Sequence, residues 1–223
     1  MIKLENIYLD MANQLFLHYG KVNATNIQKV AKRVYKEIPK DEQSFLKIAE
    51  SFLRVKAYGY YSVGTLFYKF NSVVLTKKNI NYFEDILFDY VRGWGKVDQI
   101  CYRAINPLIE SDQSLHKYLI KWSKSENKDL RRVSLVSMIR SSKTLTLEYD
   151  YDKMIALVDN LKNDEDFHVR KAVGWVLKVA YVKYPKEIEK YLRNNVQTLD
   201  RMIYRYALEH VKEPLRKELL ILK

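Results

Sequence analysis

A tryptophan and an aspartate four residues apart are the first candidates for chemistry in this sequence. Trp94 and Asp98 lie in the stretch RGWGKVDQIC, where a helix is expected to begin. Residues four apart on a helix project to the same side. A carboxylate beside an aromatic ring can stabilise a developing cation, the former by its charge and the latter by the negative face of the ring. Each residue alone also has a structural explanation, as a core tryptophan and as a first-turn acid that interacts with the helix dipole.

Two neighbouring arginines in a later stretch are candidates for binding a phosphate. In KDLRRVSLVSMIR, the apolar residues Val133 and Val136 mark the buried side of an expected helix and leave one of Arg131 and Arg132 to face a ligand. An arginine placed in this way can grip a backbone phosphate. A solvated or ion-paired side chain is the plainer explanation for either arginine alone.

A helix glycine next to a tryptophan marks a third stretch, FHVRKAVGWVLK. Gly174 inside a helix costs about 1 kcal/mol relative to alanine, so it needs a reason such as the close approach of another helix or of backbone. Asp164 or Asp166 is expected to cap this helix. Trp175 follows the glycine and can line a site or belong to the core.

The remaining patterns give no sign of a metal centre or of another common catalytic site. The four histidines have no partners at metal-ligand spacing, and the single cysteine, Cys101, fits a buried helix position better than a nucleophile. The sequence has no phosphate-binding loop of the form GxxxxGK[ST] and no GxSxG elbow. We therefore expect neither a bound metal nor an organic cofactor.

The composition favours a folded protein with a polyanionic partner. The 223 residues include 39 Lys and Arg against 27 Asp and Glu, a net charge of +12, which suits nucleic acid. No apolar run approaches the length of about 20 residues needed to cross a membrane. Glu5 and Asp10 interrupt the apolar pattern of the N-terminus, which is not typical of a signal peptide. We expect a soluble, cytoplasmic monomer.

The spacing of apolar residues predicts an all-α protein. Only 6 Gly and 4 Pro occur, and apolar residues recur at intervals of three and four almost throughout. In SFLKIAESFL this spacing places Phe45, Ile48, Ala49 and Phe52 on one face. The tyrosine-rich AYGYYSVGTLFYKF is the most strand-like stretch, yet it also fits a helical stripe, and we predict a helix.

Short polar or Pro/Gly stretches, among them IPKDE, VRGWG, SENKD and SSKTLTLEYDYD, divide the chain into pairs of helices. The second helices of successive pairs are expected to start about 32 to 39 residues apart, which is typical of two-helix repeats. These starts are expected near Lys56, Gly95, Asn127, Asp166 and Thr198. In such an α-solenoid the second helices line one concave surface, and we expect a single domain over residues 1–223. An irregular helical bundle is the alternative.

Three stretches together resemble the AlkD-like DNA glycosylases of the DNA alkylation repair family in order and spacing. They are WGKVDQIC, KWSKSENKDLRRVSL and FHVRKAVGWVLKVAYVKYPKEIEKYLRNN. The segment RKAVGWVL is the most specific, followed by the tryptophan-to-aspartate spacing of WGKVD. The resemblance is clearest over residues 40–212.

The resemblance implies a solenoid of HEAT-like repeats whose concave basic cleft binds double-stranded DNA. It also implies an enzyme of base excision repair that excises cationic alkylpurines such as 3-methyladenine and 7-methylguanine. Matching positions make Asp98 the catalytic carboxylate and place Trp94 and Trp175 beside the sugar and backbone of the lesion. Arg132 lies in the same cleft and, helped by Lys96, is expected to hold phosphates.

Two other functions remain open from the sequence. One is a catalytically silent relative that binds damaged or branched DNA through the same cleft. The other is a HEAT-type scaffold for protein interaction, which does not need the tryptophans, the aspartate and the arginine to converge.

Overall fold

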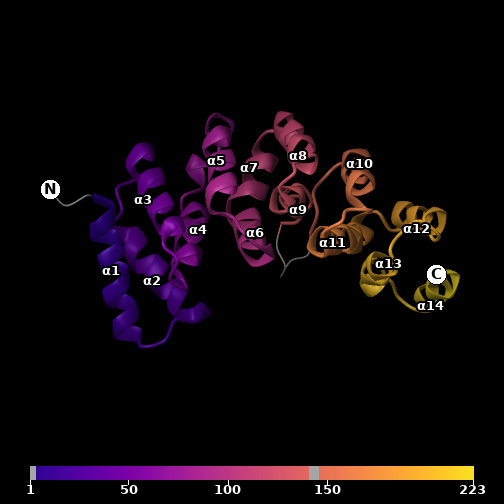
Figure 1. Ribbon diagram of the computed structural model, residues 1–223, viewed down its shortest axis with the longest axis horizontal. Helices are drawn as coiled ribbons and strands as arrows, with labels where there is room; N and C mark the ends of the chain where they lie inside the picture. Colours follow the sequence, from indigo (N-terminus) through magenta and orange to yellow (C-terminus); the bar gives the residue numbers. More distant parts are fainter. Residues whose placement is uncertain (1–3, 141–145) are drawn as a thin grey trace. The chain divides into compact units, whose positions relative to one another are not determined.

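A computed structural model describes residues 4–140 and 146–223 of the chain (Figure 1). The chain divides into two compact units. Unit 1 holds the residues up to Val91 together with Arg103–Asp112, and unit 2 holds Arg92–Tyr102 and the residues from Gln113 onward. Every regular element among the described residues is helical. None of these helices combines the length and apolar character that crossing a membrane requires.

Unit 1 is built from helices that bury one apolar face each. The helices are α1 (Leu4–Tyr19), α2 (Ala24–Glu37), α3 (Glu42–Arg54), α4 (Tyr60–Phe70), α5 (Ile80–Tyr90) and α7 (Asn106–Ser111), with 3₁₀ turns η1 (Ser72–Val74) and η2 (Lys77–Asn79). Phe45, Ile48, Ala49 and Phe52 of α3 are all fully buried, as their spacing predicts. The tyrosine-rich stretch forms α4, so the predicted helix is confirmed.

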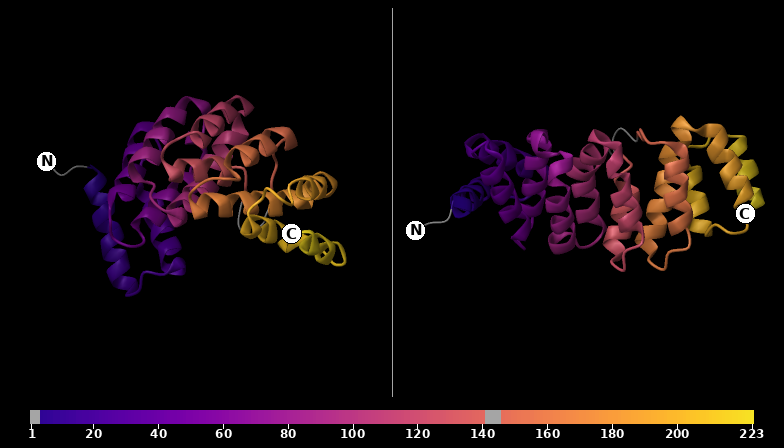
Figure 2. Two further views of the ribbon diagram at one scale, coloured as in Figure 1. Left: turned by 45° about the vertical axis from the view of Figure 1, so that its right-hand side comes forward. Right: turned by 90° about the horizontal axis from the view of Figure 1, so that it is seen from above.

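Unit 2 contains three successive helix pairs after the single helix α6 (Trp94–Ile100). The pairs are α8 (His116–Ser123) with α9 (Lys128–Val136), α10 (Tyr151–Leu161) with α11 (Phe167–Lys183), and α12 (Pro185–Asn194) with α13 (Arg201–Ala207). Turns η4 (Gln113–Leu115) and η5 (Leu208–His210) and the terminal helix α14 (Leu215–Leu222) complete it. Figures 1 and 2 show α11 lying beside α13, the second helices of two neighbouring pairs.

The second helices begin close to the predicted positions. α4, α6, α9, α11 and α13 start at Tyr60, Trp94, Lys128, Phe167 and Arg201. Side chains of polar residues cap three of these helices, since Asn127, Asp166 and Asp200 each accept a hydrogen bond from a backbone N–H of the first turn. The all-α, helical-repeat architecture is therefore confirmed. The predicted break SSKTLTLEYDYD includes residues 141–145, which lie outside the described residues, and the single-domain organisation stays a prediction.

Two arginines at equivalent places show that the pairs of unit 2 are structural repeats. Arg131 in α9 and Arg170 in α11 each lie four residues after the capping residue of their helix. Each donates from Nη1 to two carbonyl groups of the loop immediately before its own helix. The same side-chain contact is thus made in two successive repeats.

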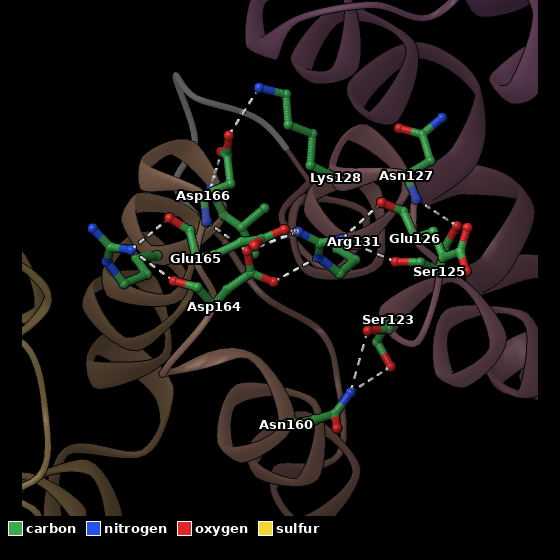
Figure 3. A network of polar contacts seen from close by, with 12 residues as sticks. Ser123, Ser125, Glu126, Asn127, Lys128, Arg131, Asn160, Asp164, Glu165 and Asp166 are labelled. Atoms are coloured by element: carbon green, nitrogen blue, oxygen red, sulfur yellow. Dashed lines mark hydrogen bonds and ion pairs between the residues drawn. The ribbon is translucent and has the colours of Figure 1, made fainter.

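Ion pairs join the loops of these neighbouring repeats (Figure 3). Arg131 Nε lies 2.6 Å from Asp164 Oδ2, and Arg131 Nη2 lies 3.1 Å from Asp164 Oδ1. Lys128 Nζ lies 3.0 Å from Asp166 Oδ2, at the cap of α11. These contacts hold Arg131 among the loops. The next residue, Arg132, takes no part in these loop contacts.

A π-helical turn, η3 (Cys101–Ile105), follows α6 directly. Pro107 explains its position, because proline has no N–H for the carbonyl of Arg103, four residues earlier. Single π-helical turns of this kind occur often at functional sites. Here the turn comes one residue after the helix that carries Trp94 and Asp98.

Candidate functional site

Gly93 sets the start of α6 and therefore the direction in which Trp94 and Asp98 project. Its backbone has φ 80° and ψ 152°, a conformation that is essentially restricted to glycine. The Gly93 N–H donates to Asp129 Oδ1 of α9 at 3.1 Å. Val97, on the same helix, is fully buried. Trp94 and Asp98 are one turn apart and project to the same side of α6.

Asp98 is paired with Arg132 through both carboxylate oxygens. Arg132 Nε donates to Asp98 Oδ1 at 3.0 Å, and Nη2 lies 2.8 Å from Oδ1 and 3.1 Å from Oδ2. Arg132 Nη1 donates to the carbonyl oxygen of His168 in α11. Arg132 is only 5% exposed. A bidentate arginine–carboxylate pair of this geometry fixes the orientation of both side chains.

The Asp98 carboxyl group is largely withdrawn from water among aromatic and basic side chains. Burial raises the pKa of the Asp98 carboxyl above its ordinary value. The charge and hydrogen bonds of Arg132 oppose the rise, and His168 and Lys171 oppose it more weakly. The pairing with Arg132 favours the carboxylate form against this rise.

Four of the predicted site residues line one pocket of about 290 Å³ within unit 2. They come from three helices: Trp94 and Asp98 from α6, Arg132 from α9 and Trp175 from α11. Lys96 is not among the lining residues. It is half-buried, and burial together with the charge of Arg92 lowers its pKa.

The pocket is also lined by three side chains that the sequence did not point to: His168, Lys171 and Tyr206. The His168 ring stacks on Trp94 with a centroid distance of 6.2 Å and an interplanar angle of 25°. His168, Lys171 and Trp175 are spaced by three and four residues, so the helical period could have placed the first two beside the tryptophan. Tyr206 comes from the next repeat, and no local pattern points to it.

Tyr206 is held in place by the close packing of α13 on α11. A Cβ added to Gly174 would lie 3.1 Å from the carbonyl oxygen of Ile203 and 3.1 Å from Tyr206 Cβ. The predicted reason for a helix glycine here, close approach of another helix, is confirmed. Lys178 Nζ lies 4.3 Å from the centroid of the Tyr206 ring and 2.9 Å from Glu209 Oε2. These contacts fix one face of the tyrosine.

Trp175 and Tyr102 meet edge to face behind the pocket, with ring centroids 6.1 Å apart. The Tyr102 hydroxyl is buried and has no hydrogen-bond partner among the described residues. Burial, and next the charge of Asp98, raise the pKa of Tyr102, which keeps the phenol protonated. The ring therefore supports Trp175 as a neutral side chain.

Cys101 lies beneath the site and is a structural residue. It is fully buried, as predicted, and its Sγ lies 3.5 Å from Ser137 Oγ. Burial raises the pKa of the thiol to about 12, which keeps it protonated. Among residues 4–140 and 146–223 there is no group of three or more metal-ligating side chains that could hold a metal ion.

Comparisons with known proteins agree on one family. The profile of the family described as DNA alkylation repair enzyme matches residues 16–211, and thus extends further toward the N-terminus than the stretches that carried the resemblance. No curated protein matches the chain.

Solved structures with the same fold share little sequence with the chain. A predicted DNA alkylation repair enzyme from Enterococcus faecalis is 16% identical, with a TM-score of 0.74 over 92% of this chain and 96% of that one. AlkD2 from Streptococcus mutans is 17% identical, with a TM-score of 0.68 over 93% and 98%. The alkylpurine DNA glycosylase AlkC of Pseudomonas fluorescens, bound to DNA containing an abasic site analog, is 15% identical, with a TM-score of 0.59 over 99% and 67%.

Proposed function

Since the chain belongs to the DNA alkylation repair enzyme family, we propose that it is a DNA glycosylase that releases cationic alkylpurines, such as 3-methyladenine and 7-methylguanine, from duplex DNA. One observation carries the proposal: the carboxyl group of Asp98, paired with Arg132, lies in a small pocket whose other walls are mainly aromatic and basic. The name of one structural neighbour, an alkylpurine DNA glycosylase, supports the same reaction. We expect the protein to act as a cytoplasmic monomer.

The protein needs to do little to make the alkylated base a good leaving group. Alkylation gives the purine a positive charge, so the electron pair of the glycosidic bond leaves with the base and neutralises it. The sugar then develops positive charge at its anomeric carbon, which the Asp98 carboxylate stabilises by proximity. A water oriented by Asp98 adds to that carbon and gives up a proton to the carboxylate.

Trp94 and Trp175 are suited to hold the sugar against the carboxylate. Trp94 is 55% exposed, although it stacks on His168, so one face of a large apolar ring remains available to a ligand. Trp175 is supported from behind by Tyr102. An aromatic face also favours an adjacent cation through its quadrupole, which adds to the effect of Asp98.

Arg132 acts on the reaction through Asp98. Its hydrogen bonds fix the carboxyl group, and its charge favours the ionised form against the effect of burial. Because these contacts use most of the guanidinium donors, positioning of Asp98 is the role that the geometry supports best. A contact of Arg132 with a DNA phosphate stays a prediction, as does a contact made by Lys96.

The decisive test replaces Asp98 by asparagine. Asp98→Asn keeps the size of the side chain but removes its charge, so release of 7-methylguanine from methylated duplex should slow on the order of a hundredfold or more, given that such charge is commonly worth about 3 kcal/mol. Single-turnover release of the base measures the rate. Duplex affinity, measured in parallel, should be preserved or slightly increased, because a negative charge is removed near a polyanion.

A matched control is Asp159→Asn, which removes the same charge from α10, away from the pocket-lining residues. This variant should release the base at the wild-type rate. Equal rates for Asp98→Asn and wild type would remove Asp98 from the mechanism.

A catalytically silent DNA-binding protein is the second candidate. The observation that favours it is the bidentate pair of Arg132 and Asp98, since Arg132 partly neutralises the charge that the reaction needs. Tight duplex binding by the wild type without measurable release of methylated base would decide for this function.

A further inference from the structure

A second pocket, of about 640 Å³, lies in unit 2 next to the Asp98 pocket. It is formed by α11, α13 and α14 together with the turn after α13. Its lining residues are Phe167, Lys171, Met202, Arg205, Tyr206, Glu209, Arg216 and Leu220. Two of these, Lys171 and Tyr206, also line the Asp98 pocket. The two pockets therefore share a wall.

The charged side chains of the second pocket are mostly cationic and exposed. Lys171, Arg205 and Arg216 are exposed, and none of them makes an ion pair within the part of the chain that the structure describes. The one acidic lining residue, Glu209, is already bound by Lys178 at 2.9 Å. The lining of the pocket thus carries an excess of positive charge.

The apolar walls of the pocket fit a sugar rather than a bare ion. Phe167 is 50% exposed at the start of α11, and the Tyr206 ring forms the shared wall. Met202 and Leu220 extend this surface across α13 and α14. A ligand with an anionic group joined to an apolar ring system matches such a site better than a small inorganic anion.

We propose that the second pocket binds a phosphodiester of the same DNA strand whose sugar lies beside Asp98. This inference rests on the proposed function, because it takes the Asp98 pocket as the place of the reactive nucleotide. The shared wall of Lys171 and Tyr206 offers such a strand a path into the second pocket, and each of its sugars is joined to the next by a phosphate. Arg205 and Arg216 offer planar donor groups that suit a phosphate.

The test uses a duplex with one abasic-site analogue, which fixes the register and needs no chemistry. Arg205→Ala/Arg216→Ala removes two exposed side chains, so the fold should be preserved. The slope of log affinity against log salt is negative, and loss of one phosphate contact makes it shallower by about 0.9. The ratio of wild-type to variant affinity should then fall about 3.5-fold between 50 and 200 mM salt.

A charge-matched control is Lys153→Ala/Lys186→Ala, which removes two exposed cations from α10 and α12, outside both pockets. Its salt slope should equal that of the wild type. Arg205→Lys/Arg216→Lys, which keeps the charges, should retain most of the slope.

Neutral methylphosphonates then locate the contact. The phosphates around the abasic site are replaced one at a time. At one position the replacement should weaken duplex binding by the wild type but not by the Arg205→Ala/Arg216→Ala variant. An unchanged salt slope for that variant, or the absence of any such position, would overturn the inference. Failure of the proposed function would be seen separately, as duplex binding without release of methylated base by the wild type.

Discussion

At the scale of single residues, Asp98 is subject to two opposing effects. Burial raises its pKa and favours the neutral acid, whereas Arg132 favours the carboxylate. The side chains of Arg132 and Asp98 are only 6% and 14% exposed, so water screens their interaction weakly. The arrangement leaves a carboxyl group that is oriented by Arg132 and poorly hydrated. Such a group interacts more strongly with a nearby cation than one in bulk water does.

Replacement of Arg132 should therefore change the pH dependence of excision. Arg132→Met keeps an apolar stem but removes the charge that lowers the pKa of Asp98. The pKa of Asp98 then rises further, and because the reaction needs the ionised form, the acid limb of the rate profile should move to higher pH. Single-turnover release measured across pH 4 to 8 tests this. Breaking the buried pair should also lower the free energy of unfolding by about 3 to 5 kcal/mol.

The adjacent arginine provides the control. Arg131 is also paired with an aspartate and is nearly as buried, but its partner, Asp164, lies in a loop outside the pocket. Arg131→Met should destabilise the fold and leave the pH profile of the wild type unchanged. Equal profiles for the two variants would mean that Arg132 has only a structural role.

The sequence could not choose between these arginines, and the physical reason lies in register. Arg131 and Arg132 are about 100° apart around α9, and both flank its buried stripe. The choice depends on the contacts of Arg131 with the loop before its own helix and with Asp164, which is 33 residues away in the loop before α11. By contrast, the pairing of Trp94 with Asp98 on one face needed only the helical period. Tyr206 was missed because its position depends on how α13 packs on α11.

At the scale of elements, helix boundaries were the most predictable feature. Polar caps such as Asp166 and Asp200 satisfy backbone N–H groups that the helix leaves unpaired, and this chemistry is local. The π-helical turn η3 was not predicted, because the apolar spacing continues through it and Pro107 alone marks the change. The polar and Pro/Gly break stretches gave the order and approximate starts of the helix pairs, whereas a capping residue was predicted only for α11.

Two glycines two residues apart should respond oppositely to alanine. Gly93 has a positive φ of 80° at the start of α6, so Gly93→Ala should lower the free energy of unfolding by about 1 to 3 kcal/mol. Gly95 lies inside α6 with open space around the added Cβ, so Gly95→Ala should be neutral or stabilising by up to about 1 kcal/mol. Denaturant unfolding of the two variants measures the difference. Similar destabilisation by both would contradict the backbone argument.

Gly174 is a helix glycine with the opposite surroundings to Gly95. Alanine there would press on Ile203 and Tyr206 of α13, and overpacking of this kind costs about 1 to 3 kcal/mol. The displaced tyrosine changes the wall shared by the two pockets, so Gly174→Ala should also weaken duplex binding. Unfolding and binding assays on Gly95→Ala and Gly174→Ala test this. Stabilisation by Gly174→Ala would show that α13 yields without cost.

At the scale of the whole molecule, the excess of positive charge over negative predicts the kind of partner and little more. A net charge of +12 attracts any polyanion. The position of the partner depends instead on where unpaired cations meet aromatic surface. Unit 2 brings these together around Lys171, Tyr206 and Trp94. Composition alone could not have located that place.

Duplex binding should therefore depend steeply on salt and weakly on sequence. Phosphate contacts release condensed counterions, so the slope of log affinity against log salt should approach −0.9 for each phosphate neutralised, or about −4 for a site that contacts four or five. Phosphates carry no sequence information, so unrelated undamaged duplexes should bind within a few-fold of one another. Titration of labelled duplexes at several salt concentrations measures both properties. An affinity independent of salt would exclude a phosphate-dominated interface, whatever the fate of Asp98→Asn, because binding is measured here without any cleavage of the glycosidic bond.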